Sequence, residues 1–207
     1  PHGVIDRYEA EDVSTNQPAR AWKNPSATGA DKAVDGDTRQ DHPHEYHSRP
    51  GVDCDAFLQG AWWGVKLKSS VTEFTVKYYA RDCCVKEGSE EIEVLVSSTW
   101  PDMNTPWIDF AGKDDAASCG TFHNLTDSSI VEMACDMSDI SEESFAYVFL
   151  RPTKCRSVPE VDGNWNNYFF IPEVTITKIS RVDNIAVCNP VTVSPCPSSS
   201  NTCTNRP

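Results

Sequence analysis

The 207-residue sequence has no apolar run of the length that a membrane-spanning helix needs, about 20 residues. It has no long segment in which apolar residues recur at the i, i+3, i+4, i+7 spacing of an amphipathic helix. The motifs of common catalytic sites are also missing, since we find no nucleophile elbow, no H-E-x-x-H and no phosphate-binding loop. These absences argue against direct membrane insertion and against a helical bundle. They lead us to expect a binding protein rather than an enzyme.

Positive charge is scarce as well. The chain carries 18 lysines and arginines against 31 aspartates and glutamates, a formal net charge of -13. Nucleic acids and anionic membrane surfaces attract proteins through a positive field, so neither is expected as a partner. An acidic chain does suit calcium, a hard cation that takes oxygen ligands. The simpler interpretation is that the acidic residues solvate the surface.

Cysteine, in contrast, is abundant. The chain has nine cysteines but no CxxC pair of the kind found in zinc sites and redox loops, and its only tight pair is Cys83-Cys84. Nine cysteines without metal-ligand spacing predict disulfides, and therefore a secreted, extracellular protein. The sequon at Asn124 is a candidate N-glycosylation site and agrees with secretion.

Several segments have the composition of β-strands, because Val, Ile, Thr and aromatic residues dominate them and turn residues bound them. They are 62–67, 71–79, 91–96, 145–150 and 170–179, with a turn expected at 68–70. Short strands at fairly regular spacing, without helical segments, predict an all-β fold: an antiparallel β-sandwich of the jelly-roll kind, or a barrel.

Two segments differ in composition from these strands. Residues 24–60 are rich in Asp, Gly, Pro, Ser and His, which predicts a long ordered loop held by an ion or a disulfide. Residues 184–207 are rich in Pro, Ser, Thr and Asn, carry three cysteines and have too little apolar material for a core. We therefore expect one β-sandwich domain over 1–183. The segment 184–207 is then a tail, or the start of a small cysteine-rich, EGF-like module of a larger multidomain protein.

Four stretches, in order, resemble the F-type lectins, fucose-binding proteins within the discoidin-like β-sandwiches. They are A-V-D-G in 24–37, W-W-G-V-K-L in 61–67, R-D-C-C at 81–84 and I-P-E-V-T-I at 171–176. The Asp-Cys-Cys after a strand is the most specific of them, whereas A-V-D-G is shared more widely. The resemblance spans about 16–180 and implies a lectin-like sandwich whose long loops are held by calcium.

The resemblance implies one calcium ion between the 24–37 loop and the glutamate of the last strand. Carried over by position, its ligands are the carbonyls of Lys32, Asp37 and Pro172, the carboxylates of Asp35 and Glu173, and either Asp53 or Ser48. Carboxylates and carbonyls suit the roughly six to eight oxygens that calcium takes. Taken singly, Asp35 is an ordinary Asp-Gly turn residue and Glu173 a solvent-facing strand residue.

F-type lectins bind fucose through one histidine and two arginines beside a disulfide between neighbouring cysteines. This chain has Ala56, Ala80 and Glu87 at the three matching positions. A one-residue shift on a strand turns a side chain to the other face, so we expect an altered specificity. The expected ligand contacts are Arg81, Lys86, His47 and Arg49, with Cys83 and Cys84 as a small apolar face.

The resemblance also implies the disulfides. In the family the partner of Cys54 stands at the position that Pro172 occupies here, which leaves Cys155 as the candidate. The implied bridges are Cys83–Cys84, Cys119–Cys135 and Cys54–Cys155.

Residues 42–47, His-Pro-His-Glu-Tyr-His, form a histidine-rich segment. Imidazoles and a carboxylate this close suggest zinc or copper, but without the i, i+4 spacing of a helix we favour an exposed loop. These histidines could instead line an altered ligand groove.

The sequence therefore predicts an extracellular recognition or adhesion module, stabilised by calcium, that binds a glycan. The alternative is a sugar-independent protein–protein or structural matrix module on the same fold. The absent fucose trio and the cysteine-rich tail favour this alternative.

Overall fold

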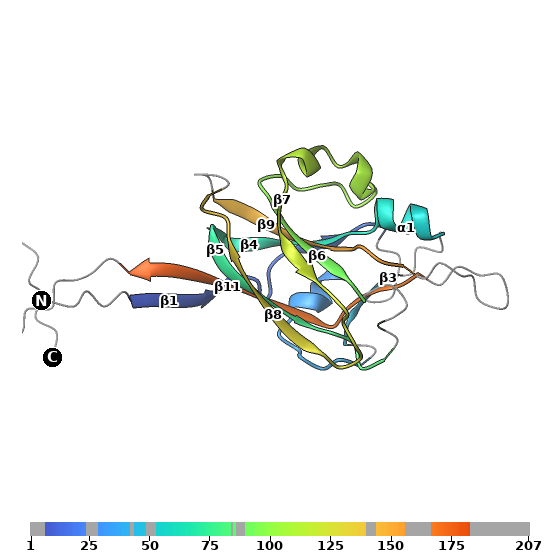
Figure 1. Ribbon diagram of the computed structural model, residues 1–207, viewed down its shortest axis with the longest axis horizontal. Coiled ribbons are helices and arrows are strands. Elements are labelled where there is room, and N and C mark those ends of the chain that lie inside the picture. The colour runs from blue at the N-terminus through green and yellow to red at the C-terminus, as the bar shows by residue number, and fades with distance from the viewer. Residues whose placement is uncertain are drawn as a thin grey trace, which may run out of the picture.

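The computed structural model describes residues 7–23, 29–41, 44–48, 53–83, 85, 90–139, 144–155 and 167–182. These residues form two larger sheets and a two-stranded ribbon (Figure 1). The four-stranded sheet has the order β1 (Arg7–Asp12), β11 (Glu173–Val182), β5 (Glu73–Tyr79), β8 (Ile130–Asp136). The five-stranded sheet has the order β2 (Ala19–Ala21), β4 (Trp63–Val71), β9 (Phe145–Pro152), β6 (Ile92–Ser97), β7 (Ala117–Phe122). The ribbon pairs β10 (Phe169–Ile171) with β3 (Tyr46–Ser48). All described pairs are antiparallel, so the predicted all-β sandwich is confirmed.

The other described elements are short: α1 (Cys54–Gly60) and the 3₁₀ turns η1 (Ala30–Val34), η3 (Trp107–Asp109) and η4 (Ala111–Asp115). Within the described ranges, no helix combines the length and the apolar character that crossing a membrane requires. α1 lies in the region predicted as loop. It forms because the Asp53 carboxylate caps its N-terminus by accepting the N–H of Ala56 at 2.8 Å, and because Phe57 is fully buried.

The burial of each strand follows its place in the sandwich. In β5 buried and half-buried residues alternate, and Phe74, Val76 and Tyr78 point into the core, as a sheet with one covered face requires. β9 lies in the middle of the other sheet, and Phe149 is buried even though its neighbours in the strand point the opposite way. The reason is a third layer: Trp107 and Phe110 cover its ring, at centroid distances of 5.8 and 5.6 Å.

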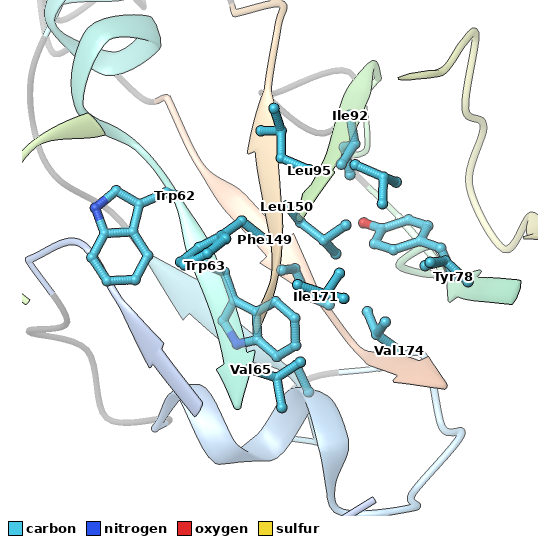
Figure 2. Close-up of a cluster of buried hydrophobic side chains, with 14 of the residues drawn as sticks. Trp62, Trp63, Val65, Tyr78, Ile92, Leu95, Phe149, Leu150, Ile171 and Val174 are labelled. Atoms are coloured by element: carbon cyan, nitrogen blue, oxygen red, sulfur yellow. The ribbon is translucent and has the colours of Figure 1, made fainter. Parts of the chain in front are cut away.

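The core also holds the loops in place. Figure 2 shows a cluster of buried hydrophobic side chains, among them Trp63 of β4. The indole Nε1 of Trp63 donates to the carbonyl of Ala30 at 2.8 Å, which fixes η1 against β4. A buried indole needs such an acceptor, and here the acceptor belongs to the loop that carries Asp35.

Two strand predictions need correction. The turn expected at 68–70 is part of β4, because the N–H of Lys68 donates to the carbonyl of Val13 at 2.9 Å and Val71 pairs with Phe145 beyond a bulge. The segment 170–179 forms two strands rather than one. They are separated at Pro172, which has no N–H to offer a sheet.

Two predicted disulfides are present. Cys54–Cys155 joins α1 to the segment after β9, across a sequence separation of 101 residues. Cys119–Cys135 joins β7 to β8, which are edge strands of the two larger sheets, across 16 residues. The predicted Cys83–Cys84 bridge involves Cys84, which lies outside the described residues, as does the whole segment 184–207.

Gly64 of β4 leaves room for the third layer. It faces Phe149 across the strand pair, and a Cβ at Gly64 would lie 2.5 Å from a ring carbon of Phe149. We expect Gly64→Ala to lower the free energy of unfolding by about 1–3 kcal/mol, because Phe149 is enclosed on its outer side as well. Urea denaturation measures this, with Lys66→Ala at an exposed position of β4 as the control. Equal midpoints for Gly64→Ala and the control would contradict this packing.

Candidate ligand and cation sites

The β3–β10 ribbon has a core face and an outer face. His47 pairs with Phe170, and their ring centroids lie 4.9 Å apart. Tyr168 stacks on Phe170 at 5.2 Å and lies 5.3 Å from His47. The neighbouring Tyr46 and Phe169 turn to the opposite side, where both are buried. The outer face of the ribbon is therefore an aromatic surface, in which Tyr168 is half-buried and Phe170, at 1% exposure, lies beneath its neighbours.

Arg81 lies on this surface from a different part of the chain. It follows the end of β5, and its guanidinium carbon is 4.3 Å from the centroid of the Phe170 ring. Its Nε is 3.1 Å from Oε2 of Glu45, the residue just before β3. The Arg81 side chain is 16% exposed and that of Glu45 is fully buried. We call Glu45, His47, Arg81, Tyr168 and Phe170 the His47–Arg81 cluster.

Glu45 is an unusual carboxyl group. Burial raises its pKa to about 7, the positive charge of Arg81 opposes this rise, and the negative charges of Asp82 and Asp41 add to it. Its proton therefore comes off near neutral pH rather than near the ordinary value of a glutamate.

The structure brings together some of the predicted ligand contacts. His47 and Arg81 meet at Phe170, and Cys83 follows Arg81 by two residues. Arg49, Lys86 and Cys84 lie outside the described residues. Ala80, at the position that matches an arginine of the family, is fully buried, and its N–H donates to the carbonyl of Ser129. An arginine there would have to fit into the core.

Sequence reasoning missed Glu45, Tyr168 and Phe170 as members of the cluster. The run Tyr168-Phe169-Phe170 was the available signal, because three adjacent aromatics on a strand cannot all face one core. Asn124, the sequon residue, is exposed in the connection between β7 and β8, with φ of 52°.

The second site surrounds Glu173, the first residue of β11. Its side chain is 1% exposed, and among the described residues neither carboxylate oxygen accepts a well-aligned hydrogen bond. Burial, and after it the charge of Asp35, raises the pKa of Glu173 to about 8. The nearby N–H of Gly36 opposes the rise, and the charges of Asp12 and Asp37 add to it. This is a buried carboxylate in a negative field.

Asp35 and Asp37 belong to the loop that follows η1. Oδ1 of Asp35 accepts the N–H of Asp37 at 2.9 Å, and Oδ2 is 3.3 Å from Nζ of Lys32. The Asp37 carboxylate binds Arg39 and His44. Asp37 is expected to bind calcium through its backbone carbonyl and not through this carboxylate.

The remaining expected calcium ligands are distributed differently. Pro172 is buried next to Glu173, between β10 and β11. The Asp53 carboxylate accepts the N–H of Ala56 at the N-terminus of α1. Ser48 ends β3, where its backbone pairs with Phe169, and its side chain is outside the described part.

These residues fit a hard cation. A positive ion beside Glu173 would compensate a charge that burial and the neighbouring carboxylates otherwise disfavour. The expected ligands are oxygens only, three of them backbone carbonyls, as calcium prefers. In the described ranges no group of three or more His, Cys, Asp and Glu side chains is arranged to hold a metal ion, so any ion here depends on those carbonyls.

No protein-family model and no curated protein matches the sequence. Solved structures do match. A fucolectin from the serum of striped bass (Morone saxatilis) superimposes with a TM-score of 0.57 at 16% identity, over 84% of this chain and 50% of that chain. The lectin domain of lectinolysin, complexed with Lewis B antigen, has a TM-score of 0.52 at 18% identity, over 81% and 96%. A family 32 carbohydrate-binding module from Clostridium perfringens NanJ, in complex with galactose, has a TM-score of 0.51 at 11% identity, over 81% and 100%.

The chain has the F-type lectin fold. This confirms the resemblance found in the sequence at the level of architecture. In this F-type lectin fold the two sites are neighbours, because Phe170 of the first lies three residues before Glu173 of the second. The β3–β10 ribbon connects them.

Proposed function

We propose that the chain is a carbohydrate-binding module and that the saccharide lies against the His47–Arg81 cluster. The observation that carries this proposal is the guanidinium of Arg81 held 4.3 Å above Phe170 beside His47 and Tyr168. Sugars have hydroxyl groups that need directional donors and C–H faces that pack on aromatic rings. The cluster offers both within a few ångströms.

The proposed activity is binding without catalysis. The solved structures with this fold that are named above are lectins or carbohydrate-binding modules, and two of them hold a Lewis B antigen or galactose. The disulfides support an extracellular location, where glycans of cell surfaces and matrix are available for adhesion.

We propose in addition that calcium binds at Glu173. The carboxylates of Asp35 and Glu173 and the carbonyls of Lys32, Asp37 and Pro172 are the residues that would hold the ion. When bound, the ion supplies positive charge and joins the loop after η1 to β11. The support is the buried Glu173 carboxylate in its negative surroundings.

A protein–protein or matrix module is the second candidate. Ala80 favours it, because the buried position leaves no space for the arginine that the fucose-binding pattern has there. Binding measurements separate the two candidates.

Titration calorimetry with Lewis b oligosaccharide, L-fucose and galactose tests the lectin function. We expect Tyr168→Ala to weaken binding at least about tenfold, by analogy with the roughly 1–3 kcal/mol that an aromatic ring contributes when a nucleobase stacks on it. Arg81→Ala should abolish measurable binding. Lys68→Ala removes an exposed charge that pairs with Glu11, and it should bind as the wild type does.

Arg81→Ala also leaves Glu45 buried without its cation, so its thermal midpoint is measured in parallel. If Arg81→Ala unfolds, Tyr168→Ala alone tests the proposed binding site. Absence of binding to every sugar on a broad glycan array, or binding that neither substitution changes, would support the protein–protein candidate instead.

A further inference from the structure

Glu45 has no counterpart in the predicted ligand set, yet it is the carboxylate that contacts the proposed ligand donor. It lies just before β3, fully buried, and reaches across to Arg81 from a segment far away in sequence. Burying a carboxylate costs folding free energy, and a role in ligand binding would account for Glu45 at this position. The inference below rests on the proposed saccharide site and adds to it.

The backbone around Arg81 is already fixed from both sides. The N–H of Asp82 donates to the carbonyl of Gln40 at 2.9 Å, and the carbonyl of Arg81 accepts the N–H of Ser128 at 2.7 Å. The side-chain amide of Gln40 donates to the carbonyl of Ala80. Only the side-chain torsions of Arg81 remain to be set, and Glu45 and Phe170 are the contacts that set them.

The contact with Glu45 engages one edge of the guanidinium. Oε2 of Glu45 faces Nε of Arg81, and within the described part of the chain the two terminal amino groups remain to donate to a ligand. A planar guanidinium held on one edge by a carboxylate and on one face by a ring has few orientations open to it. Such a donor loses little conformational entropy when a sugar binds.

We propose that Glu45 is a positioning residue, whose ionised carboxylate holds the guanidinium of Arg81 in its binding orientation over Phe170, so that saccharide affinity falls when Glu45 takes up a proton. Protonation removes the ionic attraction across the 3.1 Å contact. The half-buried ring of Tyr168 stays, but the donor beside it is no longer fixed.

The surroundings of Glu45 place this change near neutral pH. Arg81 after β5 is the cation that faces it, while Asp82 on the same segment and Asp41 before β3 are the anions. Burial and these two anions raise the pKa of Glu45 to about 7 in spite of Arg81. His44 and His47 flank Glu45 in sequence, so the Glu45→Gln variant must separate the effect of Glu45 from theirs.

The test is the pH profile of binding to Lewis b oligosaccharide and galactose, from pH 8.5 to pH 5.5, for the full chain and for Glu45→Gln. We expect the wild type to lose about tenfold in affinity on acidification through pH 7, as the loss of one charge-assisted contact implies. Glu45→Gln should bind weakly at pH 8.5 and show a flatter profile, because it lacks the carboxylate that takes up the proton. Asp82→Asn removes an anion that raises the pKa of Glu45, so the midpoint of the pH profile of this variant should lie at lower pH than that of the wild type.

A readout without sugar makes the outcome independent of the proposed function. The Nε–H proton resonance of Arg81 should be sharp and slow to exchange in the wild type at pH 8.5, and broadened both at pH 5.5 and in Glu45→Gln. If the wild type binds no sugar, the proposed function fails, while this signal still decides whether Glu45 positions Arg81. An unchanged signal in Glu45→Gln, or a wild-type pH profile retained in that variant, overturns the inference. Should Glu45→Gln fail to fold, the wild-type signal against pH gives the answer.

Discussion

Replacing Cys54 and Cys155 together by serine is expected to lower the free energy of unfolding by about 4–5 kcal/mol, as the entropy of closing a loop of roughly 100 residues implies. The bridge spans 101 residues and fixes α1, which lies in the polar region 24–60 and whose Phe57 is buried in the core. Urea denaturation under non-reducing conditions measures the loss. Domains of this size have a total stability of about 5–15 kcal/mol, so this variant should be close to unfolding at 37 °C.

The second bridge provides the matched comparison. Cys119–Cys135 closes a separation of only 16 residues, for which the same loop entropy gives about 3 kcal/mol. The double serine variant of this pair should therefore be the milder of the two. Equal losses for both pairs would show that local packing, rather than the length of the closed loop, determines what each bridge contributes.

Calcium is expected to produce the second large effect. Saturating calcium should raise the thermal midpoint of the wild type, by the equivalent of about 2.7 kcal/mol at a free concentration of roughly 100 times Kd, and EDTA should reverse the shift. Glu173→Gln should remove this response, because the buried carboxylate is the ligand that most requires a cation. Glu132→Gln, on the exposed side of β8, controls for the loss of one negative charge.

The wild type and Glu173→Gln should also exchange their order of stability when calcium is added. The pKa of Glu173 is raised to about 8 in the fold, whereas the unfolded chain has the ordinary value near 4.5, so ionising this group costs folding free energy. Without calcium the wild type should lose stability as the pH rises from about 5 to 8, and Glu173→Gln should be the more stable protein at pH 8. With calcium the wild type should be the more stable one. The proposed ion would be contradicted if EDTA leaves the thermal midpoint of the wild type unchanged and the wild type is still more stable than Glu173→Gln at pH 8.

The central strands were predictable from sequence because their side chains alternate against a core. β5 and β6 are examples, and the fold class followed from them. β8 was missed because Ile130, Glu132, Ala134 and Asp136 make its outer side exposed and mixed in character, which leaves no clear apolar pattern. α1 was missed because seven residues are too few for a helical period, and only the Asp53 cap marks its start.

The candidate site was partly predictable for a different reason. Arg81 and His47 could be named because a short motif and a resemblance pointed to their neighbourhood. Glu45 could not be found, since a glutamate in a polar segment normally faces solvent and nothing in the sequence indicates that this one is fully buried. Its burial depends on β3 pairing with β10, a contact between segments far apart in the chain.

The pairing of β1 with the end of β11 has a mechanical consequence. Arg7 lies opposite Val182, so the chain enters and leaves the domain side by side, at the end of the molecule remote from β3 (Figure 1). Beyond Lys178 the strand β11 no longer pairs with β5, and its last residues pair with β1 alone. Tension applied at these two points separates β1 from β11 starting at this end. The hydrogen-bonded pairs then open one at a time, at low force. Tension at these two points would thus separate β1 first, while the part enclosed by the two disulfides keeps its fold.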